Sequence, residues 1–261
     1  MRKEKRDLLL ILVWPIIASA LSILLKADDA LISTMLFFGV PSIYLSFRKK
    51  ELIKKVALFS LITSIPTGII IDYVMEVTQG WYLHHSVFGE FRLFNYVNLE
   101  QLIWLFLFFY FVAMFYEVFL EKECKPKLKY PSLKYWFIIL LALFGIFLLL
   151  YTIRPSRLNI DYFYLKVGIF AVIIPLALIL FRFPNLIGKF AKTGLYFLYL
   201  SLIYEVTALH LGQWGFPAEN QFIGYITFHG VIFPWEEFLF WIVLGSITAI
   251  AYYEFFDDDR K

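Results

Sequence analysis

The chain has 261 residues, of which 61% are hydrophobic and only 17% are charged, and its mean hydropathy is +0.73. This composition excludes a water-soluble globular protein and a disordered chain, and it indicates a protein that spans a membrane. The net charge of +3 is too small to indicate a nucleic-acid partner. The single cysteine, Cys124, excludes an internal disulfide and a thiolate metal site.

Eight stretches are predicted as membrane-spanning helices, because about 20 apolar residues cross the roughly 30 Å of hydrocarbon in a bilayer. In chain order they cover residues 8–25, 31–47, 56–74, 99–120, 135–153, 163–181, 190–209 and 231–255. No cleavage site follows the first stretch, so we expect it to be retained as a helix.

Clusters of Lys and Arg occur at alternate ends of these spans, at positions 2–6, 48–55, 122–134, 182–192 and 260–261. By the positive-inside rule these ends face the cytoplasm. We therefore expect a multi-pass protein of the cell membrane with its N-terminus and C-terminus in the cytoplasm.

The second half of the sequence repeats features of the first half at a nearly constant separation of about 133 to 137 positions. The pairs are Pro41 with Pro175, Phe47-Arg48 with Phe181-Arg182, Asp72 with Glu205, Trp81 with Trp214, Asn98-Leu99-Glu100-Gln101 with Pro234-Trp235-Glu236-Glu237, and Glu117 with Glu254. This pattern predicts an all-α membrane protein of about eight transmembrane helices, built as two four-helix repeats over residues 1–125 and 126–261. Because each unit has an even number of spans, the repeats are parallel, unlike the inverted repeats of many transporters.

Acidic residues recur at the same two places in both halves: the third span ends in an acid, and the fourth span begins with one. They are Asp72 and Glu100 in the first half, and Glu205, Glu236 and Glu237 in the second. Ionisable groups that border hydrocarbon are costly, so they are functional candidates. We expect these carboxylates to lie at one depth near the outer face and to line one shared cavity.

Simpler explanations cover part of this pattern. A Pro followed by two acids also suits the first turn of a helix, and most of the Trp and Tyr content fits an aromatic belt at the membrane interface. Glu76 lies one turn after Asp72, but the repeat pairs it with Leu209, so it ranks second. The four histidines lack the spacing of a metal site, and neither a metal nor another cofactor is expected.

Three segments resemble the small membrane lycopene cyclases of the heterodimeric or fused bacterial, archaeal and fungal kind. They are Ile71-Asp72-Tyr73 with Gly80-Trp81, Tyr204-Glu205-Val206 with Gln213-Trp214, and Pro234-Trp235-Glu236-Glu237 followed by Phe238-Leu239-Phe240. The resemblance spans most of the chain. The chain departs from the family at Asn98-Leu99-Glu100-Gln101, where a second Pro-x-Glu-Glu is expected, and at Glu205, where Asp is expected.

The resemblance implies cyclisation of the end groups of a linear carotenoid such as lycopene, without net redox change. A neutral carboxyl group would protonate an alkene, and aromatic faces would stabilise the carbocation. The catalytic candidates are Glu236, Glu237, Glu100, Asp72 and Glu205, and the substrate-binding candidates are Trp81, Trp214, Trp235 and Phe240. Adjacent Glu236 and Glu237 point about 100° apart on a helix, so one of them should face the cavity. We favour Glu236, because the repeat pairs it with Glu100.

The expected partners are membrane lipid and a hydrophobic polyene, together with further copies of the chain or other carotenoid enzymes. A related enzyme would hydrate or isomerise a carotenoid or another isoprenoid through the same cation. A different class of protein, a transporter or a lipid-binding protein, would use the acids to bind a proton or a cation.

Overall fold

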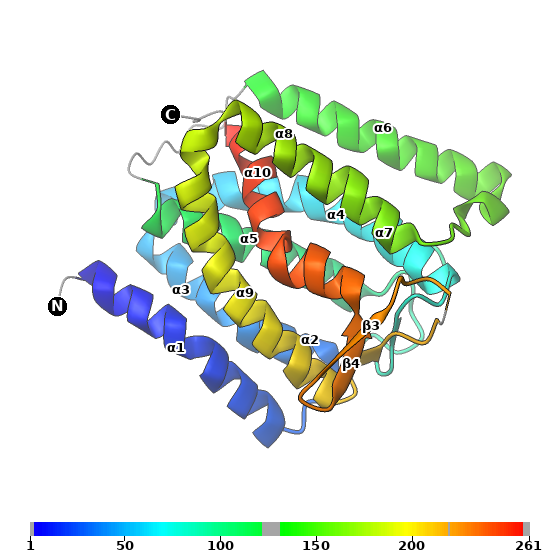
Figure 1. Cartoon of the computed structure of the whole chain (residues 1–261), viewed down its shortest axis with the longest axis horizontal. Coiled ribbons are helices and arrows are strands. Elements are labelled where there is room, and N and C mark those ends of the chain that lie inside the picture. The colour runs from blue at the N-terminus through cyan, green and yellow to red at the C-terminus, as the bar shows by residue number, and fades with distance from the viewer. Residues whose placement is uncertain (1–2, 122–130, 219, 258–261) are drawn as a thin grey trace.

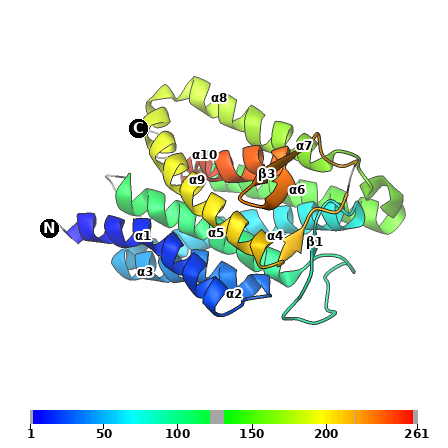
Figure 2. The same ribbon diagram turned by 60° about the horizontal axis from the view of Figure 1, so that its bottom comes forward.

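The computed structural model describes residues 3–121, 131–218 and 220–257, and most of them form long helices that run side by side (Figure 1). The proposed boundary between residues 125 and 126 and the cysteine at position 124 lie outside the described residues. Both termini lie at one end of the bundle, and the short strands lie at the opposite end, which we call the strand end (Figures 1 and 2).

The first half contains four passes along the bundle. They are α1 (Lys3–Leu24); α2 (Ala30–Thr34), η1 (Met35–Gly39) and α3 (Val40–Arg48) in continuous succession; η2 (Lys50–Leu52) with α4 (Ile53–Val77); and α5 (Leu99–Phe119). The second half follows with α6 (Pro131–Ile153), η3 (Pro155–Leu158), α7 (Phe163–Val167), η4 (Gly168–Ile173), α8 (Ile174–Arg182), η5 (Pro184–Leu186), α9 (Ile187–His210), η6 (Glu237–Val243) and α10 (Gly245–Asp257).

Six helices of the described residues are long and apolar enough to cross a membrane, and the pair formed by Glu237–Val243 and Gly245–Phe256 would make a seventh. A shorter apolar helix, Phe137–Ile153, lies within α6. Large apolar side chains are exposed along the outside of the bundle, for example Ile16 at 58% and Phe181 at 91%. Such an apolar exterior suits lipid rather than water. The prediction of a helical, multi-pass membrane protein is confirmed at this level.

The predicted span over residues 231–255 is wrong at its beginning. Val231–Pro234 form the strand β4, which pairs antiparallel with β3 (Tyr225–Phe228). The helical part that follows is bent by 52° between η6 and α10. Hydropathy measures how apolar a segment is and does not distinguish a buried strand from a helix, so the predicted span extends over the apolar residues of β4.

Two helical segments contain a π-helical turn at corresponding places. The turn η1 precedes Pro41 at the beginning of α3, and η4 precedes Pro175 at the beginning of α8. A proline cannot donate the backbone hydrogen bond that would continue a regular α-helix, which accounts for the widened turn before it.

One hydrophobic core extends across both halves of the chain. It includes buried aromatic residues of α5, α9 and α10, among them Phe111, Phe197 and Tyr253. The rings of Phe111 and Phe197 meet edge to face, with their centroids 5.1 Å apart. The two halves therefore pack as one body.

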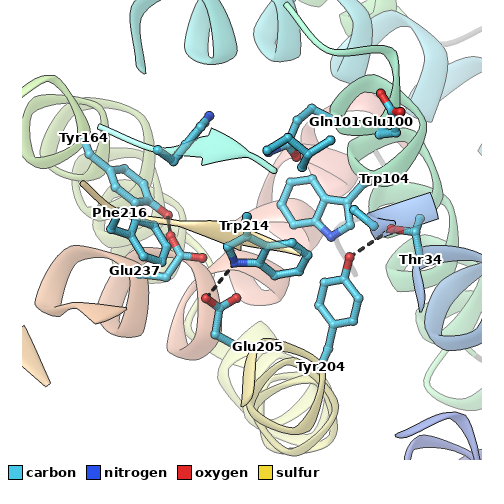
Figure 3. Close-up of a pocket in the computed structure, with 13 residues that line it drawn as sticks. Thr34, Glu100, Gln101, Trp104, Tyr164, Tyr204, Glu205, Trp214, Phe216 and Glu237 are labelled. Atoms are coloured by element: carbon cyan, nitrogen blue, oxygen red, sulfur yellow. Dashed lines mark hydrogen bonds between the residues drawn. The ribbon is translucent and has the colours of Figure 1, made fainter. Parts of the chain in front are cut away.

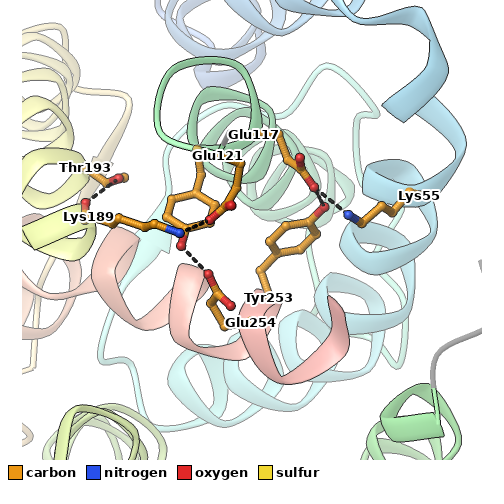
Figure 4. A network of polar contacts seen from close by, with 8 residues as sticks. Lys55, Glu117, Glu121, Lys189, Thr193, Tyr253 and Glu254 are labelled. Carbon is orange, nitrogen blue, oxygen red and sulfur yellow. Dashed lines mark hydrogen bonds and ion pairs between the residues drawn. The ribbon is translucent and has the colours of Figure 1, made fainter. Parts of the chain in front are cut away.

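A buried polar network joins the halves (Figure 4). It lies near the beginning of α4 and the ends of α5 and α10, opposite to the strand end. Lys55 forms an ion pair of 2.6 Å with Glu117, and both side chains are 1% exposed. The Tyr253 hydroxyl also donates to Glu117, while the Tyr116 hydroxyl donates to Glu254. Each half therefore contributes a tyrosine to a glutamate of the other half.

Candidate functional site

Two buried acids near the strand end are held by a tryptophan from the loop that follows their helix. In α4, the indole Nε1 of Trp81 donates to Oδ1 of Asp72 over 2.9 Å. In α9, the indole Nε1 of Trp214 donates to Oε1 of Glu205 over 3.1 Å. Asp72 and Glu205, which the repeat aligns, therefore both accept a hydrogen bond from a tryptophan.

The second oxygen of these acids differs between the halves. The backbone N–H of Asn98 donates to Oδ2 of Asp72 over 2.8 Å. The sequence aligns Asn98 with Pro234, which has no N–H to donate to Glu205. Glu205 nevertheless lies in a cavity and is buried. The second oxygen of the Glu205 carboxyl group is therefore available to a ligand, whereas Oδ2 of Asp72 already accepts the hydrogen bond from Asn98.

Glu100 and Glu236 both anchor the loop that precedes their helix. Oε1 of Glu100 accepts hydrogen bonds of 2.7 Å from the backbone N–H of Val87 and from the hydroxyl of Ser86. Oε1 of Glu236 accepts a hydrogen bond of 2.8 Å from the backbone N–H of Ile223. Both glutamates are 1% exposed. Glu100 and Glu236 therefore share a structural role, since each fixes a loop that precedes its helix.

Glu237 takes a different direction from Glu236. Its side chain lines a cavity, and its Oε2 accepts a hydrogen bond of 2.6 Å from the hydroxyl of Tyr164 in α7. The positions that the repeat aligns with Tyr164 and Glu237 are Ala30 and Gln101, which offer neither a hydroxyl nor a carboxyl group. This part of the site is therefore complete only in the second half.

A small cavity of about 70 Å³ brings together two acids of the second half, Glu205 and Glu237. Figure 3 shows the carboxyl groups of Glu205 and Glu237 pointing toward one another beside the indole of Trp214. Glu100 also lines this cavity, whereas Glu236 is not among the residues that line it. The choice of Glu236 as the cavity-facing member of the adjacent pair is thus not supported by the geometry, which favours Glu237.

A larger cavity of about 350 Å³ adjoins the small one, and its walls are mostly apolar and aromatic. The two cavities share the side chains of Trp81, Gln101, Trp104 and Tyr164. Asp72 lines the larger cavity, so the structure places it near the pair of acids but in a separate compartment. A long apolar ligand in the larger cavity could therefore present one end to Glu205 and Glu237.

The aromatic residues expected to bind substrate divide into two groups. Trp81 and Trp214 line the small cavity, and Phe240 lines the large one and is buried. Trp235, by contrast, is 50% exposed and packs on Phe238, with ring centroids 6.3 Å apart. It lines neither cavity, and its place on the outside fits the role of an interfacial aromatic.

Glu76, the second-rank candidate, is tied to the same helix end as Asp72. Its Oε1 accepts a hydrogen bond of 2.7 Å from the side-chain amide of Asn98. It lines neither cavity. Across the described ranges, no three His, Cys, Asp or Glu side chains gather in a way that could hold a metal ion.

Sequence reasoning missed Tyr164, Gln101 and Trp104. Gln101 was within reach, because the repeat aligns it with Glu237. Trp104 was within reach as well, because the same separation of 136 positions aligns it with Phe240. Tyr164 carries no such signal, since it is one aromatic residue among 54 in the chain (7 Trp, 17 Tyr and 30 Phe) and the repeat aligns it with Ala30. Its place in the site follows only from how α7 packs.

Comparisons with known proteins add no relative: no family model matches the chain, and neither a curated protein nor a solved structure matches it.

Proposed function

We propose that the protein is a membrane enzyme that closes a ring at the end group of a linear carotenoid such as lycopene, without net oxidation or reduction. The observation that carries this proposal is the meeting of Glu205 and Glu237 at a small cavity that adjoins a larger apolar one (Figure 3). Acid-catalysed cyclisation of a polyene needs a carboxyl group to give a proton, a second group to take one, and a dry, apolar compartment.

Glu205 is our choice for the proton donor and Glu237 for the acceptor. Glu237 accepts the hydroxyl of Tyr164 over 2.6 Å, whereas Glu205 accepts an indole N–H over 3.1 Å. The shorter hydrogen bond to an oxygen donor is the stronger support for a carboxylate. The carboxyl group with the weaker support therefore keeps its proton in the resting enzyme and is the one that has a proton to donate to an alkene.

The proposed reaction conserves atoms and electrons. Glu205 gives its proton to one carbon of the terminal double bond, and the C–H bond formed leaves a tertiary carbocation. An internal double bond attacks this cation, so that a carbon–carbon bond closes the ring and the cation moves onto the ring. Glu237 then removes a proton from a neighbouring carbon, which leaves a ring double bond and an isomer of the substrate.

Aromatic side chains around the cavities support the cationic steps. The indoles of Trp81, Trp104 and Trp214 line the small cavity, and the negative faces of such rings attract cations. Their rings also exclude water, which would otherwise capture the cation.

We further infer that the chain is a duplicated four-span unit with eight passes through the membrane and one reaction centre. Matching Trp–acid bonds, matching π turns and the reciprocal Tyr–Glu bonds support the duplication. Strand β1 (Tyr82–Leu83) pairs antiparallel with β2 (Trp214–Gly215), so equivalent loops of the two units meet as they would across a two-fold axis. The unit with Gln101 and Ala30 lacks the groups that the proposed chemistry requires.

Conversion of lycopene in cells that accumulate it tests the proposal. Wild-type protein should yield cyclised pigment, and Glu237→Gln should lower the yield by roughly 10²-fold or more. Glu236→Gln is the matched control: it changes the adjacent residue in the same way but keeps an oxygen that can accept from Ile223. Immunoblots of the membrane fraction would report equal amounts of each variant.

The outcomes separate this proposal from its alternatives. Unchanged cyclised pigment from the Glu237→Gln variant, at equal protein level, would contradict the assignment of the site. A hydroxylated pigment from the wild type would instead indicate that water captures the same cation, which defines a hydratase. No new pigment from wild-type protein present in the membrane would contradict the proposed function.

A further inference from the structure

Two walls of the larger cavity belong to helices at the outside of the bundle. One wall is formed by Ile139, Leu140 and Leu143 of α6. The facing wall is formed by residues of α7 and η4: Val167, Gly168, Phe170, Ala171 and Val172. The passes that contain α6 and α7 lie at the edge of the bundle (Figure 1). The cavity extends from these two passes inward to residues of α4, α5, η6 and α10.

The walls of this cavity reach the outer surface. Leu140 is 4% exposed, but its neighbours Ile139 and Leu143 are 48% and 49% exposed. On the other side, Phe170 is 69% exposed. A side chain that lines a cavity and is also half exposed lies at the rim of an opening.

This opening lies near the middle of the two passes. Leu143 is close to the centre of α6 (Pro131–Ile153), and Phe170 is close to the centre of the pass from Phe163 to Arg182. The centre of a membrane-spanning helix is surrounded by hydrocarbon. The residues at the rim are apolar, as contact with lipid chains requires.

We infer that the polyene reaches the reaction centre sideways, out of the bilayer, through a portal between α6 and η4, and that one end of it is threaded inward past Phe108 and Trp104. The identity of the polyene rests on the proposed function. The route rests on the cavity: its inner part is lined by Phe108 and Trp241, whose ring centroids lie 4.1 Å apart, and it ends at the side chains shared with the small cavity. A substrate that is insoluble in water needs no aqueous path.

Photolabelling in vesicles tests the route without relying on catalysis. The protein is reconstituted in phosphatidylcholine vesicles that contain hexadecane carrying a terminal diazirine, irradiated, and mapped by mass spectrometry. We expect label on Phe108 and Ala249, which line the cavity but are only 2% and 1% exposed. Added lycopene should reduce that label. Absence of label on cavity residues, with label on exposed residues such as Leu141, would overturn the inference.

Paired tryptophan variants show whether the portal is the path. Leu143→Trp places a bulky indole at the rim of the opening, so it should lower both the label on Phe108 and the cyclisation rate by roughly tenfold. A tenfold change corresponds to about 1.4 kcal/mol. Leu141→Trp is the matched control on the same helix: Leu141 is 56% exposed but does not line the cavity, so both readouts should stay within about twofold of wild type. Equal labelling of Phe108 in the two variants would overturn the portal.

A second pair on the facing wall guards against failure of the first to fold. Val172→Trp should block the label, and Ile173→Trp should not, because Ile173 is 40% exposed and does not line the cavity. The experiments can also contradict the portal and the cyclisation reaction independently of each other. Labelling that Leu143→Trp blocks, without any cyclisation by the wild type, would keep the portal and discard the reaction; cyclisation unaffected by either cavity-facing variant would do the reverse.

Discussion

The backbone N–H of Asn98 donates a hydrogen bond of 2.8 Å to Oδ2 of Asp72, and this bond has no counterpart at Glu205, because Pro234 stands where the N–H would be. Both oxygens of Asp72 are thus used within the protein, since Trp81 donates to the other one. The two acids occupy equivalent positions but have different surroundings. Asp72 fixes the end of α4, and Glu205 is available to a ligand.

Substitution of these two acids should have opposite effects on turnover and stability. Glu205→Gln should lower cyclisation by roughly 10²- to 10⁴-fold, the range for loss of a general acid, with little change in thermal stability. Asp72→Asn places an amide opposite an N–H donor, so it should cost about 1–3 kcal/mol of stability and leave turnover per folded molecule within about tenfold. Product chromatography and thermal unfolding in detergent measure the two effects. Equal losses of turnover from both variants would contradict the single reaction centre.

Tyr164→Phe tests the positioning of Glu237. Loss of the hydroxyl that donates to Oε2 should lower kcat by roughly tenfold to a hundredfold and leave KM nearly unchanged, because the bond orients a reacting group rather than the substrate. Tyr162→Phe is the matched control, since Tyr162 is 41% exposed and lines neither cavity. Steady-state kinetics in detergent or lipid separate kcat from KM. A rise in KM with kcat intact would assign Tyr164 to substrate contact instead.

The sequence allowed the acids to be located but not their directions to be assigned. Asp72, Glu205 and Glu100 were found because helix ends and the repeat are visible in the pattern of apolar and acidic residues. Glu236 and Glu237 could not be told apart, because the helix begins only one residue before Glu236 and changes to a π-helical segment at Glu237. A π-helical backbone changes the angle between successive side chains, so the phase of an α-helix does not carry over.

The alignment of Glu236 with Glu100 reflects a shared structural contact, which the sequence alone does not distinguish from a shared catalytic role. Both residues bind the backbone of a preceding loop, which is a reason for a glutamate to recur in a duplicated unit. A repeated residue therefore reports what both copies need in order to fold. Under the proposed function, the reaction centre lies where the halves differ, as at Gln101 and Glu237.

Lys55 and Glu117 form the most buried ion pair that we describe, and removal of one partner should be costly. Lys55→Met leaves a charged carboxylate without its cation and should destabilise the protein by about 3–5 kcal/mol. The double variant Lys55→Met/Glu117→Gln removes both charges and keeps an acceptor for Tyr253, so it should recover most of that loss.

The ion pair of Lys189 with Glu121 provides the comparison, because its side chains are 27% and 11% exposed. Lys189→Met should cost less than Lys55→Met, since solvent screens an ion pair that is partly exposed. Thermal unfolding of the purified variants measures both. A double variant no more stable than Lys55→Met would show that packing of the lysine stem, and not the uncompensated charge, sets the cost.

Gly168 is predicted to be intolerant of even a methyl group. A Cβ there would lie 2.1 Å from ring carbons of Phe240, so Gly168→Ala should force the ring to move and cost about 1–3 kcal/mol. Gly145 in α6 is the control, because a Cβ there meets no atom within 4 Å. Gly145→Ala should raise stability by about 0.5–1 kcal/mol, the helix preference of alanine over glycine. A stable Gly168→Ala variant would mean that Phe240 moves freely.

The short pairing of β1 with β2 has a mechanical consequence. Tyr82 and Leu83 directly follow Trp81, and β2 begins with Trp214 itself, so the strand ladder links the two indoles that hold Asp72 and Glu205. The ladder therefore connects the loop that holds the acid of one half directly to the loop that holds the acid of the other. Under the proposed function, the first half therefore supports the geometry of the reaction centre in the second half, although it lacks the acid and the hydroxyl of that centre.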